Sequence, residues 1–363
     1  MEKHRPKNQI LAQWLKKIGS KIGFSHKRFC VLTPNELLIY KKEYHELDHH
    51  ILIKPELKTE IIQHNDSLHL LITPPNESSI CLSADEKEPI LNWAQQIRNL
   101  LLITPNMSID DFEIIKIISR GYYGKILLAK KKSTNDYCAI KVIHKNRLIK
   151  ANKVHSIFVE RNVLVNTHHP FIISIRNAFQ TDTKVYLVLE YVPGGSIFTM
   201  IHQRERIPLK EIQLYVAEIS LALNYLHNNH IIYRDLKSEN VLLDSQGFLR
   251  LTDFGLAKIL TIQLTTSTFF GTSEYLAPEI IEKKAYGIQI DWWALGILTY
   301  ELFFGTTPFR HPNSNELIHL ITTSSPTFPD DCDPKIKNFI LSLLEKNPEK
   351  RLTFKELLVH PFF

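Results

Sequence analysis

Five short motifs follow one another across residues 112–363, and their order constrains the fold more than any single motif does. The first is a glycine-containing segment between two strand-like runs, and the second is a lysine in the run that follows. The others are an acidic loop, an aspartate followed by Phe-Gly, and a closing Ala-Pro-Glu. They are Ser119-Arg-Gly-Tyr-Tyr-Gly124, Lys141, Tyr233-Arg-Asp-Leu-Lys-Ser-Glu-Asn240, Asp253-Phe-Gly255 and Ala277-Pro-Glu279.

This series resembles the signature of the protein kinases. A glycine loop lets backbone N–H groups approach phosphates, which charge alone could not do. Ser119 stands where the first glycine of the family belongs, while Gly121 and Gly124 are kept. A lone glycine loop would more often be an ordinary turn, but five motifs in order are specific. The resemblance implies a two-lobed fold over residues 112–363, with a small sheet-rich lobe, a larger helical lobe and ATP between them.

The resemblance assigns a role to the polar residues of the motifs, and each role suits the chemistry of phosphoryl transfer. Asp235 would orient the substrate hydroxyl and accept its proton. Lys237 would neutralise charge on the phosphoryl group in transfer. Lys141 would hold the α and β phosphates and pair with Glu160 on the next helix.

ATP and Mg²⁺ are the cofactors that the resemblance implies. Asn240 and Asp253 would supply the hard oxygen ligands that Mg²⁺ prefers. Leu189 would be the gatekeeper beside the adenine ring, and hinge backbone groups would bind the ring itself. The residues expected to line the nucleotide site are Ile118, Ser119, Arg120, Gly121, Tyr122, Tyr123, Gly124, Lys125, Ile126, Ala139, Lys141, Glu190, Val192 and Leu242.

Further details resemble the AGC group of serine/threonine kinases, and with the N-terminal region they resemble the protein kinase B (Akt) family. Tyr233 replaces the commoner His, and Asp291-Trp-Trp-Ala-Leu-Gly296 follows the AGC pattern. Lys237 lies two residues after the catalytic Asp, and with Thr272 it indicates transfer to serine or threonine. Protein substrates are therefore expected.

Thr268 stands where this group is phosphorylated by an upstream activating kinase. A phosphate there adds nearly two negative charges, which would pair with Arg234 and Lys258 and order the segment. His155 lies one position away from the histidine that usually contacts this phosphate, which would rotate it off the contact. An unmodified loop threonine is the alternative.

Two further departures concern substrates and regulation. Ser196 replaces the family's glutamate that touches ribose and a substrate arginine, while Glu239 and Glu301 are kept. We therefore expect a weakened preference for basic residues upstream of the target. The sequence ends at His360-Pro-Phe-Phe363, where AGC kinases continue into a regulatory tail, so activation by tail phosphorylation in cis is not expected.

Before residue 103 the apolar residues come first in short runs and then at a helical period. The runs have strand-like composition and are separated by Pro, Asn and Ser. From Ile90 the apolar residues recur at i, i+3, i+4 and i+7, which predicts an amphipathic helix over about 88–102 that covers a sheet. We expect strands at 28–32, 37–40, 68–72 and 80–82.

This N-terminal region resembles a pleckstrin homology domain, from Trp14-Leu-Lys-Lys in a first strand to Trp93 in the closing helix. The expected class is α+β, with a β-barrel or sandwich capped by a helix over 8–102, a linker at 103–111 and the catalytic domain at 112–363. In lipid-binding members, basic residues hold phosphoinositide phosphates. The matching or nearby residues are Lys17, Arg28, Lys16, Lys21 and Lys27.

The charge is concentrated near the N-terminus. The chain carries +6, but residues 1–42 hold ten Lys or Arg against two acids. Such a patch suggests an anionic partner, and each base near an anionic leaflet contributes about 1 kcal/mol. His26 stands where stronger binders have Arg. A solvated basic face is the alternative, and nucleic-acid binding is disfavoured because exposed aromatic residues do not alternate with the bases.

The remaining expectations concern cellular context. Four cysteines lie far apart without metal-ligand spacing, which favours free buried thiols in a reducing compartment. The start of the chain lacks the apolar core of a signal peptide. We expect a cytoplasmic monomer that visits the membrane surface transiently. A pseudokinase adaptor that only docks on membranes is the competing function.

Overall fold

In the computed structural model the chain forms two compact units, the first holding the N-terminal sheet and the second holding every catalytic motif. The catalytic motifs all fall within residues 114–175 and 188–363. The structure describes residues 6, 9–19, 25–33, 35–53, 57–64, 67–75, 77–102, 107–151, 153–259 and 273–363.

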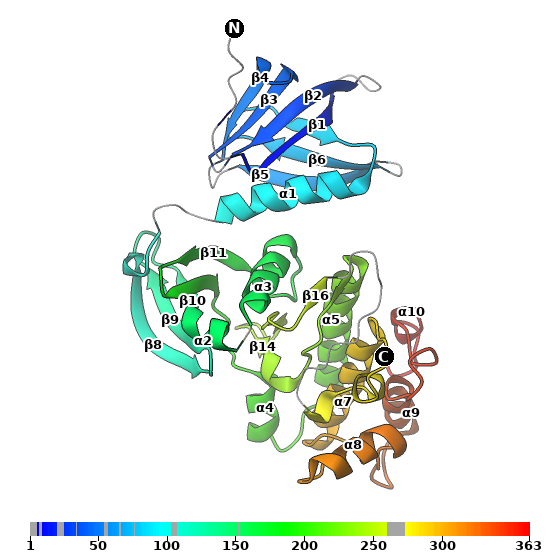
Figure 1. Cartoon of the computed structure of the whole chain (residues 1–363). Helices are drawn as coiled ribbons and strands as arrows, with labels where there is room; N and C mark the ends of the chain where they lie inside the picture. The colour runs from blue at the N-terminus through cyan, green and yellow to red at the C-terminus, as the bar shows by residue number, and fades with distance from the viewer. Residues whose placement is uncertain are drawn as a thin grey trace. The chain divides into compact units, whose positions relative to one another are not determined.

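The N-terminal sheet is antiparallel, with its seven strands in the order β4-β3-β2-β1-β7-β6-β5. Helix α1 packs against β5 and β6 (Figure 1). The predicted sheet closed by one C-terminal helix is therefore confirmed. The elements are β1 (Leu11–Ile18), β2 (Ser25–Leu32), β3 (Glu36–Lys42), β4 (His45–Leu52), β5 (Lys58–His64), β6 (Ser67–Thr73), β7 (Ile80–Ser83) and α1 (Lys87–Leu102).

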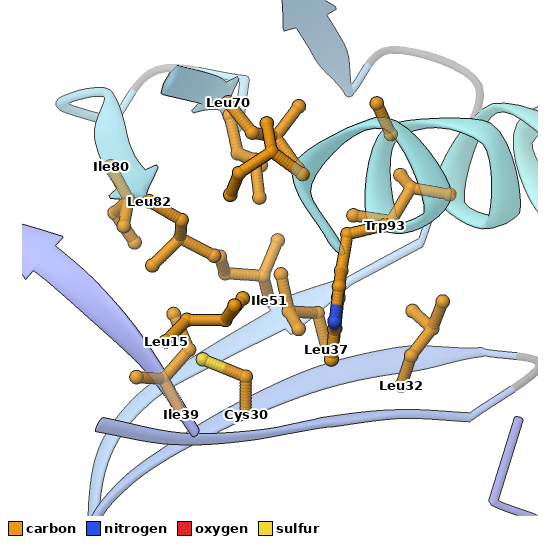
Figure 2. Close-up of a cluster of buried hydrophobic side chains, with 14 of the residues drawn as sticks. Leu15, Cys30, Leu32, Leu37, Ile39, Ile51, Leu70, Ile80, Leu82 and Trp93 are labelled. Carbon is orange, nitrogen blue, oxygen red and sulfur yellow. The ribbon is translucent and has the colours of Figure 1, made fainter. Parts of the chain in front are cut away.

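The core of this unit is built from alternate residues of the strands and one face of α1. Figure 2 shows Trp93 of α1 pointing into a cluster that includes Leu15, Leu37 and Ile51. Trp93 is fully buried, and truncation of a buried residue of this size destabilises a domain by about 3–5 kcal/mol. The helix therefore contributes to the hydrophobic core of this unit.

Two strands, β4 and β5, lie where no strand was expected. Strand β4 reads His-Glu-Leu-Asp-His-His-Ile-Leu, and only its Ile51 is buried. Strand β5 is similarly polar. Both strands end the sheet order and each has one neighbour, so their sequences lack the apolar runs that mark a buried strand. Hydrogen bonding to the adjacent strand, which sequence composition does not display, holds them in the sheet.

The catalytic region begins with a five-stranded sheet in the order β11-β12-β10-β9-β8. The β9–β10 pair places Ala139 opposite Leu128 and Lys141 opposite Ile126, which fixes the lysine relative to the glycine loop. The elements are β8 (Phe112–Arg120), β9 (Gly124–Lys131), β10 (Tyr137–His144), α2 (Lys145–Lys150), α3 (Val154–Asn166), β11 (Ile175–Gln180) and β12 (Lys184–Glu190).

The rest of the chain is mainly helical (Figure 1) and is organised around α7, whose residues 290–302 are all buried. Helices α5 and α9 pack against it. The elements are α4 (Ile197–Gln203), α5 (Leu209–Asn228), β13 (Ile231–Ile232), β14 (Val241–Leu243), β15 (Leu249–Leu251), β16 (Lys258–Ile259), α6 (Pro278–Ile281), α7 (Gln289–Phe304), α8 (Ser314–Thr323), α9 (Pro334–Leu343) and α10 (Phe354–Leu357).

All four cysteines are free, but only part of the expectation about burial is met. Cys30 and Cys138 are buried, whereas Cys81 and Cys332 are half-buried. Among the described helices, none combines the length and apolar character that crossing a bilayer requires.

Candidate functional site

A lysine between two carboxylates forms the centre of the site. The Lys141 Nζ on β10 donates to Glu160 Oε1 on α3 at 2.6 Å and to Asp253 Oδ1 at 3.0 Å. Burial alone would lower the pKa of Lys141, but the two carboxylates raise it well above its usual value. The charge of Lys141 in turn lowers the pKa of Asp253. The lysine is therefore charged and Asp253 is ionised at neutral pH.

The acidic loop places a carboxylate, an amide and a second lysine next to one another. The Asn240 Nδ2 donates to Asp235 Oδ2 at 2.7 Å, and Lys237 Nζ lies 3.3 Å from Asp235 Oδ1. Asp235 is buried, and burial raises the pKa of its carboxyl, although Lys237 and Asn240 oppose that effect. A carboxylate in this environment is a stronger base than an exposed aspartate.

Asp291, quoted above only as part of a family pattern, holds this loop in place. Its carboxylate on α7 accepts from the Tyr233 and Arg234 backbone N–H groups at 3.0 and 2.8 Å, and it lies 2.8 Å from His227 Nε2. Arg234 has a φ of 68° and Asp253 a φ of 56°, which are left-handed conformations that non-glycine residues rarely adopt. Buried hydrogen bonds to Asp291 offset the strain at the first of them.

The glycine loop is shaped by one close approach. A Cβ on Gly124 would lie 1.8 Å from the Val142 carbonyl oxygen, so no other residue fits there, whereas a Cβ on Gly121 would meet open space. Arg147 of α2 donates to the Tyr122 carbonyl at 2.7 Å and braces the tip of the loop. Sequence reasoning missed Arg147, because no motif connects α2 with the loop.

A cavity of about 420 Å³ brings many of the expected residues together. Its walls include Ser119, residues 121–126, Lys141, Glu160, Asp235 and Asp253. The remaining expected residues do not line this cavity. They are Ile118, Arg120, Ala139, Glu190, Val192, Lys237, Asn240 and Leu242.

The expected hinge begins at the last residue of β12. The Glu190 side chain accepts from the Ser174 N–H at 3.0 Å and lies 3.5 Å from Arg250 Nε. Its carboxylate is thus already engaged, which leaves backbone groups for a ligand, as the family resemblance implies. Ala139 and Val192 are buried, while Leu242 is half-buried and Ile118 is exposed.

The residues expected to bind Mg²⁺ fit that ion chemically. Both N–H contacts of the Asn240 amide go to Asp235, so its amide oxygen is the atom left for a metal. Asp253 is ionised and adds carboxylate oxygen. Among the described residues no group of three His, Cys, Asp or Glu could hold a metal by itself. A pair of oxygen ligands completed by phosphates is how proteins usually hold Mg²⁺.

Of the four residues expected to take part in control by phosphorylation or to indicate the target hydroxyl, the structure describes two. Thr268 and Thr272 lie outside the described residues. Arg234 donates to the Leu256 carbonyl at 2.6 Å and to the Tyr286 hydroxyl at 3.1 Å. Burial, and secondarily the nearby Arg234, lowers the pKa of Lys258. Arg234 and Lys258 are thus close enough for their charges to interact.

The two acids expected to read basic substrates differ in accessibility. Glu239 is exposed. Glu301 is buried, and its carboxylate accepts from the Tyr275 hydroxyl and, at 3.0 Å, from the Ser238 hydroxyl. Ser196 caps α4 by accepting from the Thr199 N–H at 3.2 Å. The exposed negative charge in this region is therefore that of Glu239.

In the N-terminal unit, the two bases expected to hold phosphate converge on one aspartate. Arg28 Nε on β2 lies 2.7 Å from Asp48 Oδ2, and Lys17 Nζ on β1 lies 3.3 Å from the same oxygen. Lys16 points to the opposite face of β1 and pairs with Asp85. Lys27 is exposed, and Lys21 lies outside the described residues. Asp48 was not anticipated from the sequence.

Comparison with known proteins agrees with this geometry. Residues 112–363 match the model of the protein kinase domain. A RAC family serine/threonine-protein kinase homolog of Dictyostelium discoideum is 38% identical over 282 residues, which are 77% of this chain and 63% of the relative. Serine/threonine-protein kinase Sgk1 of Danio rerio is 40% identical over 301 residues, 81% of this chain and 69% of the relative. The RAC serine/threonine-protein kinase of Drosophila melanogaster is 40% identical over 263 residues, 71% of this chain and 43% of the relative. The chain thus spans less than two thirds of the first and third of these relatives.

Proposed function

Because this chain belongs to the protein kinase family, we propose that it transfers the γ-phosphoryl group of ATP to serine or threonine hydroxyls of proteins. The observation that carries the proposal is the cavity that Lys141, Asp235 and Asp253 line together with the glycine loop. These residues come from segments far apart in the sequence. An adaptor that only binds would not require all of them to face one cavity.

Asp235 is the base in this proposal. Burial raises the pKa of its carboxyl, and Asn240 holds one of its oxygens, so the other oxygen is oriented toward an incoming hydroxyl. Lys237, 3.3 Å from that other oxygen, neutralises charge as the phosphoryl group transfers. Positioned acid–base groups of this kind contribute about 10²- to 10⁴-fold to a rate.

Lys141 holds the nucleotide phosphates, and Glu160 keeps the lysine side chain extended into the cavity through the 2.6 Å contact. Asn240 and Asp253 are the residues that would hold Mg²⁺, which when bound neutralises phosphate charge. Backbone groups of Glu190 and Val192 bind adenine, since the Glu190 carboxylate is engaged elsewhere.

In this proposal the enzyme prefers substrates with basic residues upstream of the target, and Glu239 is the main residue that binds them. Ser196 brings no charge, and the Glu301 carboxylate is buried between two hydroxyl donors. A substrate arginine would have to displace Ser238 or Tyr275 to reach Glu301. The preference is accordingly weaker than three exposed acids would give.

Control in this proposal involves the segment around Thr268 and the N-terminal unit. Phosphorylation of Thr268 by an upstream kinase would bring a dianion to Arg234 and Lys258, where two cations are close enough to interact. The N-terminal unit, through Lys17 and Arg28, would bring the enzyme transiently to membranes that contain phosphoinositides. The support is the convergence of these two bases at one end of β1 and β2.

A phosphoryl-transfer assay on a peptide library tests the proposed activity. The wild-type chain should label serine and threonine, and Asp235→Asn should lower kcat by about 10²- to 10⁴-fold. Asp330→Asn, which makes the same change at an exposed acid between α8 and α9, is the control and should leave the rate unchanged. Equal labelling by the wild type and Asp235→Asn would overturn the proposal and favour an adaptor.

A further inference from the structure

The contact that the phosphoinositide proposal leaves unexplained is the one between its two bases and Asp48. Asp48 Oδ2 lies 2.7 Å from Arg28 Nε and 3.3 Å from Lys17 Nζ, so a single oxygen occupies the space between both cations. All three side chains are largely shielded, with 16% of Asp48 and Arg28 and 22% of Lys17 exposed. A carboxylate oxygen here stands where a phosphate oxygen would stand.

The backbone aims Asp48 at this position. In the β3–β4 ladder Ile39 pairs with His49 and Tyr40 pairs with Leu47, so Asp48 is the extra residue of a β-bulge. A bulge changes the alternation of side chains along a strand, and bulges recur where a side chain has to be redirected. The neighbouring His49 ring lies 3.2 Å from Lys17 Nζ through Nε2 and borders the same cluster.

Asp48 carries its charge throughout the physiological range. Burial alone would raise the pKa of Asp48, but hydrogen bonds from Arg28 and Lys17 and their charges lower it to about 2. The cluster therefore holds two positive charges and one negative charge. An anion that approaches meets the attraction of Lys17 and Arg28 and the repulsion of Asp48 at the same point.

We propose that Asp48 is a built-in competitor at this anion site, which a phosphate has to displace from Arg28 and Lys17 before it binds. The inference rests on the proposed phosphoinositide binding and adds how that site selects its ligand. A phosphomonoester carries about −1.5 to −2 charges and three acceptor oxygens, against one charge and two oxygens on the carboxylate. Phosphomonoesters can replace Asp48, whereas singly charged headgroups compete poorly with it.

Replacing Asp48 with Asn removes its charge and distinguishes a competitor from a purely structural residue, because the two roles predict opposite changes in ligand affinity. Asp48→Asn keeps the shape and an acceptor for Arg28. If Asp48 is a competitor, Asp48→Asn should tighten phosphate binding by about tenfold, because a like charge within hydrogen-bond distance of the ligand is gone. As a structural brace, the same change should weaken binding, because the bases lose their positioning.

The experiment uses the full chain with two probes. One is a phosphatidylcholine vesicle that contains a phosphatidylinositol bisphosphate, measured by pelleting, and the other is soluble inositol hexakisphosphate, measured by calorimetry. Tighter binding to both probes assigns the site to the phosphate itself, and tighter binding to vesicles alone assigns it to the lipid surface. Vesicles of phosphatidylserine should bind the wild type poorly and should also bind Asp48→Asn more tightly than the wild type.

Three further variants and a melting curve keep the test decisive. Asp48→Glu retains the charge and should bind within about twofold of the wild type if competition is the cause. Asp85→Asn makes the same change in net charge on the opposite face of β1 and should leave binding unchanged. Lys17→Ala in the Asp48→Asn background should abolish the gain. Unchanged melting temperatures show that the variants fold.

The outcomes separate the inference from the function on which it rests. Equal or weaker binding by Asp48→Asn, with a wild type that binds phosphoinositide, overturns the competitor and leaves the lipid function intact. If neither the wild type nor Asp48→Asn binds either probe, the anion site itself is wrong and both proposals fall.

Discussion

The catalytic cleft and the N-terminal ion cluster use the same kinds of side chain with opposite charge in surplus. The ion-paired side chains around Lys141 and Asp235 comprise two cations and three carboxylates, and those of the N-terminal cluster comprise two cations and one carboxylate. The residues are Lys141, Lys237, Glu160, Asp235 and Asp253 in the cleft, and Lys17, Arg28 and Asp48 in the N-terminal unit. A surplus negative charge suits phosphates that arrive with a metal cation, whereas a surplus positive charge suits phosphates that arrive alone. The two sets differ by two carboxylates, and we expect this difference to decide which form of phosphate each site accepts.

Neutralising Asp253 should have the largest effect, because it removes the negative surplus of the cleft. Asp253→Asn should lower kcat by about 10²- to 10³-fold, the size expected when a group that stabilises transition-state charge is lost. The measurement is the peptide-phosphorylation rate at increasing Mg²⁺. Asp331→Asn, which makes the same change at an exposed acid between α8 and α9, serves as the control. Full activity with an unchanged Mg²⁺ dependence would show that Asp253 does not bind the metal.

Breaking the buried lysine pair should have the next largest effect. Glu160→Gln removes the buried partner of Lys141 and should raise the KM for ATP about tenfold and lower stability by about 1–3 kcal/mol. Steady-state kinetics and thermal melting check both. Glu282→Gln removes an exposed partner of Lys284 and should change neither, since surface pairs contribute little. Similar losses in the two variants would show that burial of the pair does not matter.

The two regions should also respond differently to acid. Burial raises the pKa of Asp235, so the acid limb of kcat/KM should lie above the ordinary aspartate value of 3.8. The pKa of Asp48 is lowered to about 2, so its ion pairs stabilise the fold above pH 3.8 and lose that contribution as the pH falls toward 2. The stability difference between the wild type and Asp48→Asn should therefore shrink below about pH 4. An unchanged difference down to pH 2 would show that Asp48 is not ion-paired.

The smallest effect is expected from Asp85→Asn, in the segment between β7 and α1. Asp85 is exposed and pairs with Lys16, and such pairs contribute little in water. Melting temperature and kinase activity should both be unchanged. A clear loss of stability would mean that the exposed Lys16–Asp85 pair stabilises this unit, contrary to what its exposure predicts.

The sequence predicted the cleft better than the N-terminal cluster, and the reason is physical. The pairing of Lys141 with Glu160 was implied by the resemblance to the kinases, in which the lysine pairs with a glutamate on the next helix. Asp48 reaches Lys17 and Arg28 only because a β-bulge changes the alternation of β4, and sequence periodicity cannot show a bulge. Strand β4 itself was missed, because it is polar and held mainly by hydrogen bonds.

Within the cleft, the residues missed are those that act through the backbone. Asp291 accepts from the Tyr233 and Arg234 N–H groups, and Arg147 donates to the Tyr122 carbonyl. Backbone groups are the same in every residue, so no side-chain pattern identifies such partners. The overall class, a sheet closed by a helix followed by a kinase domain, depended on apolar periodicity and motif order and was predictable.

The opposite surplus of charge is tested most directly by calorimetry on two variants that each lose one carboxylate. Asp253→Asn is titrated with ATP in the presence of Mg²⁺, and Asp48→Asn is titrated with inositol hexakisphosphate. We predict opposite signs: weaker binding in the cleft, where the metal loses a ligand, and tighter binding in the N-terminal unit, where the phosphate loses a competitor. A change of the same sign in both variants would contradict this account.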